Sequence, residues 1–268
     1  MSAAVAHGAR RRAWPARALD LHVGLVLAFL ALPTLAVVPM SFNAAEFLIF
    51  PPPGYSTRWY AAFFERREWW GSAITSLVVA VLATAIATVL GTAAALAIAR
   101  GRVPLRGAVA ALLLTPMMVP AIVTAVALYR VFAAWGIAGT IPGLVAAHVV
   151  MALPFVLVNV SAVLNRMDWT VLRAARSLGA SPLYAFRRIT LPMIRPGVLA
   201  GALFAFLTSF DEVVVSLFMT GIGAMTLPVQ MWTGIRFEIN PIVAAVSTML
   251  ILVTASTFTA FALLRRTP

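Results

Sequence analysis

The chain has 268 residues, of which 62% are hydrophobic and only 10% are charged, whereas soluble domains average about 45–50% apolar residues. All 20 basic residues are Arg and there is no Cys, which excludes a P-loop lysine, Schiff-base catalysis, disulfides and Cys-ligated metal sites. The three His are too scattered in the sequence to suggest a local metal site. A formal net charge of +12 is compatible with nucleic-acid binding or with a membrane protein. The distribution of the charge along the chain decides between these two classes.

Six apolar stretches are long enough to cross a membrane, because a hydrocarbon core of about 30 Å needs about 20 helical residues. The predicted spans are Leu21–Met40, Gly71–Ala99, Ala108–Phe132, Ile141–Leu164, Gly197–Thr220 and Pro241–Leu264. The first span is longer than the apolar core of a secretory signal, and Pro33 and Pro39 also argue that it is retained. The sequence therefore predicts an all-α membrane protein with six transmembrane helices.

The arginines fall mainly on one side of these spans. If the N-terminus is cytoplasmic, the inner segments contain 15 Arg and only two acidic residues. The outer segments then contain five Arg and six acidic residues. Because basic residues are retained in the cytoplasm, both termini are predicted to be cytoplasmic. The predicted parts are a cytoplasmic tail (1–20), a first transmembrane helix (21–40), a periplasmic loop (41–70), a five-helix transmembrane domain (71–264) and a cytoplasmic tail (265–268).

The outer loop is rich in proline and aromatic residues. Pro51–Pro53 with Gly54 predict a short extended segment and a turn. Six aromatic residues between Trp59 and Trp70 surround Arg66 and Arg67. We interpret them as an amphipathic helix and aromatic belt at the outer membrane interface, with a binding role as the alternative.

The inner loop over residues 165–196 is long and patterned. A first helix is predicted by four apolar residues at helical spacing, Trp169, Leu172, Ala175 and Leu178. Gly179 is expected to end it, because Gly adopts the left-handed conformation at little cost. Ser181 and Pro182 then predict the N-cap and first position of a second helix, which we expect Pro192 and Pro196 to end. Such a loop is either a docking element for a soluble partner or an amphipathic hairpin on anionic lipid, which its six Arg would favour.

Residues 173–192, RAARSLGASPLYAFRRITLP, resemble the loop motif of the permease subunits of binding-protein-dependent ABC importers. The positions that match are Ala174, Ala175, Gly179, Ile189, Leu191 and Pro192. The resemblance extends from about Gly71 to Leu264 and implies the type I importer permease fold in a bacterial inner membrane. The motif begins with Glu where this chain has Arg173, so either the partner has a compensating surface or this position tolerates change.

The resemblance implies that this loop couples the chain to a cytoplasmic ABC ATPase dimer, which binds the ATP and Mg and closes to drive alternating access. The implied coupling residues are Arg173, Ala174, Ala175, Leu178, Gly179, Ser181, Pro182, Ile189, Leu191 and Pro192. The other implied partners are a second homologous permease, a periplasmic or lipoprotein solute-binding protein and membrane lipid. No cofactor, metal, nucleic acid or catalytic activity is expected for this chain.

The sequence of the fifth predicted span indicates a subfamily within these importers. The string SFDEVVVSLF over Ser209–Phe218, followed by Thr226-Leu227-Pro228, is similar to the second permease of spermidine/putrescine-type importers. Iron(III) and aminoalkylphosphonate importers carry similar strings. A polyamine is therefore the expected solute, with those two as alternatives.

Two adjacent carboxylates interrupt this span. Asp211 lies 14 residues beyond Gly197, about 21 Å along a straight helix, and Glu212 is expected about 100° around the axis from it. A carboxylate at that depth costs several kcal/mol unless it faces a partner or water. Ser209, Asp211 and Glu212 are thus candidates for a cation pathway, and pairing with Arg130 or with the sister permease is the structural alternative.

Other polar and small residues are interpreted as packing elements. His148 in the fourth span is expected to be a hydrogen-bonded packing residue. Helix-packing surfaces are predicted at Gly91, Ala94, Ala95, Gly197 and Gly201. Two rival functions lack support in the sequence: a self-contained secondary transporter, for which no inverted repeat is evident, and an intramembrane enzyme, for which no catalytic pairing is evident.

Overall fold

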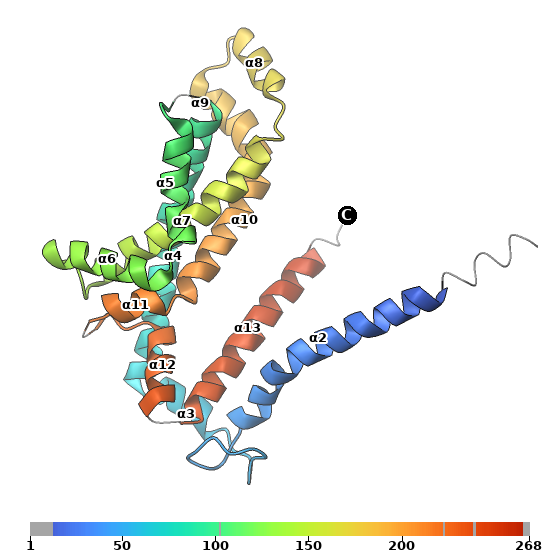
Figure 1. Cartoon of the computed structure of the whole chain (residues 1–268), viewed down its shortest axis with the longest axis vertical. Coiled ribbons are helices and arrows are strands. Elements are labelled where there is room, and N and C mark those ends of the chain that lie inside the picture. The colour runs from blue at the N-terminus through green and yellow to red at the C-terminus, as the bar shows by residue number, and fades with distance from the viewer. Residues whose placement is uncertain (1–12, 102, 222, 238–239, 265–268) are drawn as a thin grey trace, which may run out of the picture. The chain divides into compact units, whose positions relative to one another are not determined.

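The computed structural model describes residues 13–101, 103–221, 223–237 and 240–264 (Figure 1). Most of the predicted tail over residues 1–20 and all of the tail over 265–268 lie outside this part. The described residues are mainly helical, with one isolated β-bridge between Asn43 and Tyr55. The chain divides into two compact units, one made of Met1–Arg66 with Gly234–Pro268 and the other of Arg67–Thr233.

In the described part, four helical segments are long and apolar enough to cross a membrane, Ala18–Ser41, Arg67–Ala99, Ile141–Leu164 and Pro182–Phe210. A bent helix pair qualifies as a fifth span if it is counted as one, and a shorter apolar helix covers Ile242–Ser256. The all-α membrane fold is confirmed, because helices overlap all six predicted spans, although two of these spans are broken. The number of crossings and their orientation stay predictions.

The first unit contains α2 (Ala13–Ser41), α3 (Arg58–Glu65) and α13 (Ile242–Leu264), and α2 and α3 both contact α13. Helix α3 shows that the loop between the first two predicted spans contains a helix, as predicted. Trp59 and Phe63, however, are each only 6% exposed. The Trp59 indole N–H donates to the carbonyl of the buried Asn43 at 2.8 Å. The interpretation as an interfacial belt is wrong for these two side chains, because they pack inside the unit.

The core of the second unit is built from α4 (Arg67–Ala99), α7 (Ile141–Leu164) and α10 (Leu191–Phe210), which contact one another. Val156 on α7 lies against glycines of both neighbours. A Cβ added at Gly91 would lie 2.8 Å from Val156 Cβ, and one at Gly201 would lie 2.9 Å from Val156 Cα. The helices can approach so closely only because both residues lack a side chain, which confirms the predicted packing role of these glycines.

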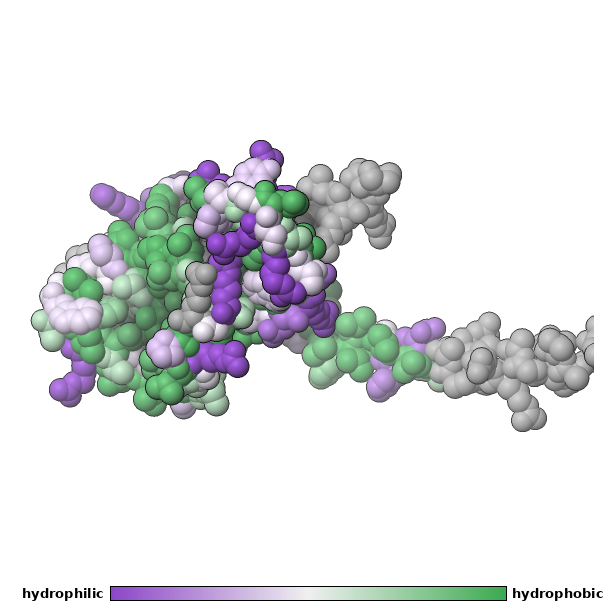
Figure 2. All heavy atoms as spheres, turned by 90° about the horizontal axis from the view of Figure 1, so that it is seen from above, coloured by the Kyte–Doolittle hydropathy of each residue, from purple (hydrophilic) through white to green (hydrophobic). Residues whose placement is uncertain are grey.

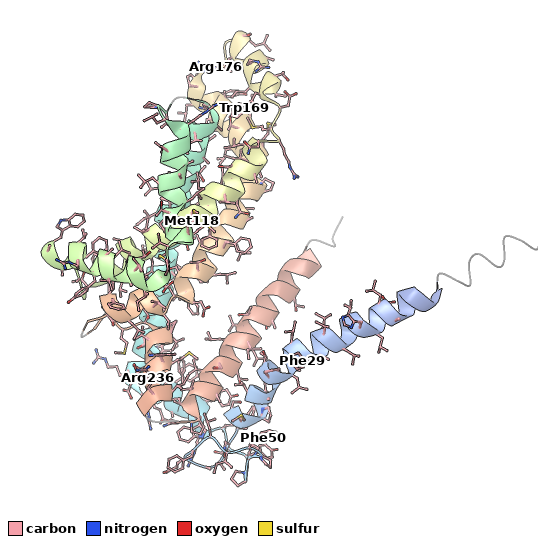
Figure 3. All side chains as sticks on the ribbon, in the orientation of Figure 1. Phe29, Phe50, Met118, Trp169, Arg176 and Arg236 are labelled. Atoms are coloured by element: carbon pink, nitrogen blue, oxygen red, sulfur yellow. The ribbon has the colours of Figure 1, made fainter. Side chains whose placement is uncertain are left out.

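The third predicted span is not one helix. It consists of α5 (Arg106–Met118) and α6 (Ala121–Ala134), which meet at 108°, so the prediction of a continuous helix over Ala108–Phe132 is wrong. Pro120 explains the break, since proline has no N–H to donate and disfavours a helical residue before it. Val119 is accordingly extended, with φ −84° and ψ 136°. Met118 lies beside the bend and is 82% exposed (Figure 3).

The fifth predicted span begins earlier than expected. Helix α9 (Pro182–Ala185), a π-helical turn η1 (Phe186–Thr190) and α10 follow one another as a single helical run from Pro182 to Phe210. Pro192 and Pro196 therefore do not end the second loop helix, contrary to the prediction. The π-turn helps to accommodate Pro192 without a break, because the N–H of Leu191 bonds the carbonyl of Phe186, five residues back.

The same span also ends earlier than predicted. Helix α10 stops at Phe210, and the chain continues as the short α11 (Val214–Met219) and as α12 (Leu227–Phe237). The prediction of an unbroken helix over Gly197–Thr220 is therefore wrong. The Glu212 carboxylate accepts the N–H of Val215 at 2.9 Å, which stabilises a new helix start just after the break.

Candidate functional site: the inner loop and the end of helix α10

The first helix of the inner loop, α8 (Trp169–Ser177), begins at an acidic cap. Oδ1 of Asp168 accepts hydrogen bonds from the hydroxyl and the N–H of Thr170 at 2.7 and 2.8 Å. The bonds from the Thr170 hydroxyl and N–H, with a smaller contribution from Arg173, lower the pKa of the Asp168 carboxyl. Asp168 was not among the residues predicted to shape this loop, although an Asp directly before an apolar stripe is a typical N-cap signal.

The end of α8 and the start of α9 follow the predicted pattern. Gly179 has φ +89°, in the left-handed region that favours glycine. The N–H of Ala180 donates to the carbonyl of Ala175 at 3.0 Å, which closes the helix end. Oγ of Ser181 accepts the N–H of Tyr184 at 3.3 Å, and Pro182 occupies the first turn of α9. The predicted order of helix, glycine stop, Ser-Pro start and second helix is therefore confirmed.

Most motif residues of the loop are exposed. Exposed positions are Arg173, Ala174, Leu178, Gly179, Ser181, Pro182, Leu191 and Pro192, whereas Ala175 and Ile189 are half-buried. Leu178 was expected to share a stripe with Trp169, but it caps the helix end and is 89% exposed. Figure 2 views the molecule from the α8 end and shows hydrophilic side chains interspersed with apolar ones there.

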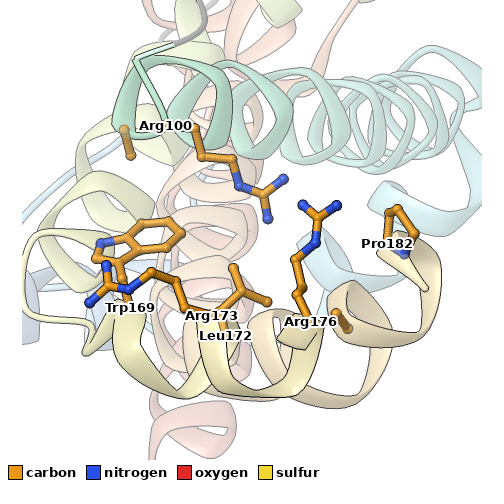
Figure 4. A pocket seen from close by; sticks show the side chains of 8 residues that line it. Arg100, Trp169, Leu172, Arg173, Arg176 and Pro182 are labelled. Carbon is orange, nitrogen blue, oxygen red and sulfur yellow. The ribbon is translucent and has the colours of Figure 1, made fainter. Parts of the chain in front are cut away.

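Helix α8 therefore presents two different faces. One face bears Val171 and ends near Leu178, and these apolar side chains are 47% and 89% exposed. The other face lines a pocket of about 450 Å³ that it shares with the end of α4 and the start of α9 (Figure 4). The pocket is lined by Ala99, Arg100, Trp169, Leu172, Arg173, Arg176, Pro182 and Ala185.

The three residues predicted for the pathway have separate roles at the end of α10. Ser209 is buried, and its Oγ lies 2.8 Å from Nδ1 of His148. Nε2 of His148 lies 3.0 Å from Oγ of Ser216 on α11, so this imidazole joins α7, α10 and α11. His148 is thus the hydrogen-bonded packing residue that the sequence predicted.

The two carboxylates differ from the helical arrangement expected for them. Asp211 is the C-cap of α10 and Glu212 lies between α10 and α11, so they are not successive residues of one helix. Glu212 is half-buried and accepts the N–H of Val215. Asp211 is exposed, and within the described residues its carboxylate forms no ion pair with Arg130 and has no other polar partner.

Two kinds of similarity place this chain among transport proteins. The family model of the binding-protein-dependent transport system inner membrane component matches residues 87–267. The spermidine/putrescine transport system permease protein PotC of Haemophilus influenzae is 36% identical over 85% of this chain and 88% of its own. The putrescine transport system permease protein PotI of Escherichia coli is 34% identical over 83% and 82%.

Two further similarities are more distant. The trehalose transport system permease protein SugB of Mycobacterium tuberculosis is 32% identical over 63% of this chain and 62% of its own. A bacterial ABC transporter involved in the import of the acidic polysaccharide alginate has a chain that superposes with a TM-score of 0.70 over 94% of this chain and 95% of its own, at 11% identity. This chain is therefore a multi-pass membrane protein that belongs to the family of inner membrane components of binding-protein-dependent transport systems.

Proposed function

We propose that the chain is a permease subunit of an ABC importer for a small cationic solute of the polyamine class, driven by a separate ATPase. Its identity of 34–36% to two polyamine permeases, over more than four fifths of its length, carries this proposal. A second permease completes the pathway, and a solute-binding protein delivers the solute from outside. The chain itself is a non-catalytic subunit, and ATP and Mg bind to the ATPase.

The inner loop is the docking element for the ATPase in this proposal. The exposed face of α8, with Val171 and Leu178, is an apolar surface on a helix that the rest of the unit leaves uncovered. From Pro182 the chain continues as one helical run of 29 residues to Phe210, about 43 Å at the usual rise. Movement of the loop is thus carried along α10 to the neighbourhood of Asp211.

Asp211 is the pathway residue of the acidic pair. Its carboxylate is exposed at the end of α10, whereas that of Glu212 is engaged at the start of α11. An available carboxylate offsets part of the hydration that a polyamine ammonium loses on entering the pathway. Glu212 has the structural role of holding the helix break in place.

The subunit assignment is tested by affinity purification of the full-length chain from its native membrane. An ABC ATPase and a second permease are expected to co-purify with it. Recovery of an active transporter that contains this chain alone would refute the assignment and would support a self-contained secondary transporter.

The solute class is tested by uptake of labelled putrescine and spermidine in cells that carry Asp211→Asn. We expect uptake to fall at least tenfold, with normal assembly of the complex. Glu65→Gln is the matched control, because Glu65 is another exposed carboxylate and lies on α3 in the other unit. Equal uptake by Asp211→Asn and the unmodified chain removes Asp211 from the pathway, and uptake of iron(III) or an aminoalkylphosphonate instead of polyamines overturns the solute class.

A further inference from the structure

The pocket beneath α8 contains three guanidinium groups. Arg173 and Arg176 come from α8 and Arg100 from the end of α4, and the eight lining residues include no carboxylate (Figure 4). In Figure 4 the side chains of Arg100 and Arg176 extend toward each other from opposite walls. The one acidic residue of the loop, Asp168, accepts hydrogen bonds from Thr170, interacts more weakly with Arg173 and does not line the pocket. The pocket therefore has the charge of an anion-binding site.

The pocket lies on another face of α8 than the apolar Val171–Leu178 surface proposed for the ATPase, although two of the implied coupling residues, Arg173 and Pro182, also line it. Trp169, Leu172, Arg173 and Arg176 follow one another at spacings of three, one and three residues, so they form one face of α8. This face lies toward α4 and α9 of the same chain. The exposed Val171 and Leu178 lie outside this lining, so a partner could cover them without entering the pocket.

The chemistry of the walls fits a phosphate group at the membrane surface. Guanidinium groups bind phosphate through paired, charge-assisted hydrogen bonds. The wall from α4 is the end of an apolar helix of 33 residues, where Ala99 is followed by Arg100. Trp169 adds an aromatic ring, a side chain that is typical of membrane interfaces. A volume of about 450 Å³ is much larger than one carboxylate and falls within the range of small-ligand pockets.

We propose that this pocket binds the phosphate of an anionic membrane lipid of the cytoplasmic leaflet, held by Arg100, Arg173 and Arg176. Basic pockets between membrane helices on the cytoplasmic side are a known means of holding anionic headgroups. The bound lipid links the end of α4 to α8 and thereby steadies the loop. The replacement of the family's Glu by Arg173 then serves lipid binding within this chain.

The test is native mass spectrometry of the full-length chain, purified with its partner subunits in detergent and titrated with phosphatidylglycerol. Arg173→Glu is the informative variant, because it restores the residue that the family motif has and Glu is as good a helix former as Arg. We expect it to reduce retained phosphatidylglycerol about tenfold or more, since a hydrogen bond to a charged group contributes about 1.5–3 kcal/mol. Arg187→Glu is the matched control, because Arg187 is exposed on the same loop but does not line the pocket.

Selective loss of phosphatidylglycerol in Arg173→Glu, with phosphatidylcholine retention unchanged, supports the proposal. Equal loss in Arg173→Glu and Arg187→Glu overturns it, because the effect is then one of total charge. Normal lipid retention with loss of the ATPase in Arg173→Glu also overturns it and identifies an acidic ATPase segment as the occupant. Displacement of the lipid by millimolar inorganic phosphate assigns the site to a soluble phosphate instead. Failure of the unmodified chain to recover any ATPase refutes the proposed function without affecting the lipid measurement.

Discussion

Replacement of His148 tests whether the break between α10 and α11 is held by polar contacts. Its imidazole is 1% exposed and lies between Oγ of Ser209 and Oγ of Ser216, at 2.8 and 3.0 Å. His148→Phe keeps an aromatic ring of similar volume but can neither donate nor accept a hydrogen bond. It leaves two buried hydroxyls without their partner, so we expect the chain to be destabilised while its packing is largely kept.

The expected loss in the free energy of unfolding follows from the two hydroxyls that are left without a hydrogen-bond partner. A buried polar group without a partner costs about 1–3 kcal/mol, and a helical serine recovers part of this by bonding the carbonyl four residues back. A net loss of about 2–4 kcal/mol is expected, which for a chain of this size lowers the melting temperature by about 5–15 °C. The triple variant His148→Phe, Ser209→Ala, Ser216→Ala removes the orphaned hydroxyls and should regain most of the loss.

Thermal unfolding of the purified chain in one detergent, followed by tryptophan fluorescence, measures these differences. Ser72→Ala is the matched control, because Ser72 is also buried but its hydroxyl bonds only the carbonyl of Glu68 on its own helix. We expect that control to melt close to the unmodified chain. A His148→Phe chain as stable as the control, or a triple variant no more stable than His148→Phe, would show that the imidazole does not hold the break.

Three further substitutions test the loop and the core. Gly179→Val forces a branched residue to φ +89°, a strain of about 1–3 kcal/mol, and should reduce co-purification of the ATPase, whereas Gly179→Asn should largely preserve it. Gly201→Leu should destabilise the chain by about 1–3 kcal/mol through overpacking against Val156, whereas Gly71→Ala, which has open space, should not. Because the folded-state pKa of Asp168 is lowered, its cap is fully present above about pH 4 and is lost as the pH falls through the folded-state pKa. Amide exchange in the first turn of α8 should then accelerate relative to other helices, and Asp168→Ala should show the same acceleration at neutral pH.

The features that the sequence predicted well depend on local chemistry. Gly179, Ser181 and Pro182 each act within one helix turn, through a left-handed φ, a side-chain cap and a missing N–H. Such local effects can be predicted without knowing which residues pack against the helix. The helix–turn–helix of the inner loop was therefore predictable from local residues, apart from the cap at Asp168, the exposure of Leu178 and the end of the second helix, which Pro192 and Pro196 do not mark.

The features that the sequence predicted poorly depend on distant contacts. Pro120 breaks the third span, but Pro154 lies inside α7 without ending it. Pro154 is buried in the best-packed helix of the second unit, where neighbouring helices retain the helical path. The break after Phe210 likewise involves His148, more than 60 residues away along the chain. Residue type alone does not distinguish these cases, because tertiary packing decides them.

The composition restricts how a transporter built on this chain can be driven. Without any Lys the chain has no P-loop lysine for ATP, so under the proposed function the driving force enters through contacts with the ATPase. Within the described residues, the inner loop joins directly to a helical run that extends from Pro182 to Phe210. The far end of that run is joined by His148 to α7 and α11, beside Asp211. In the proposed function, a force on α8 is carried to the carboxylate through this continuous helix, and substitutions at either end of α10 should impair the same transport step.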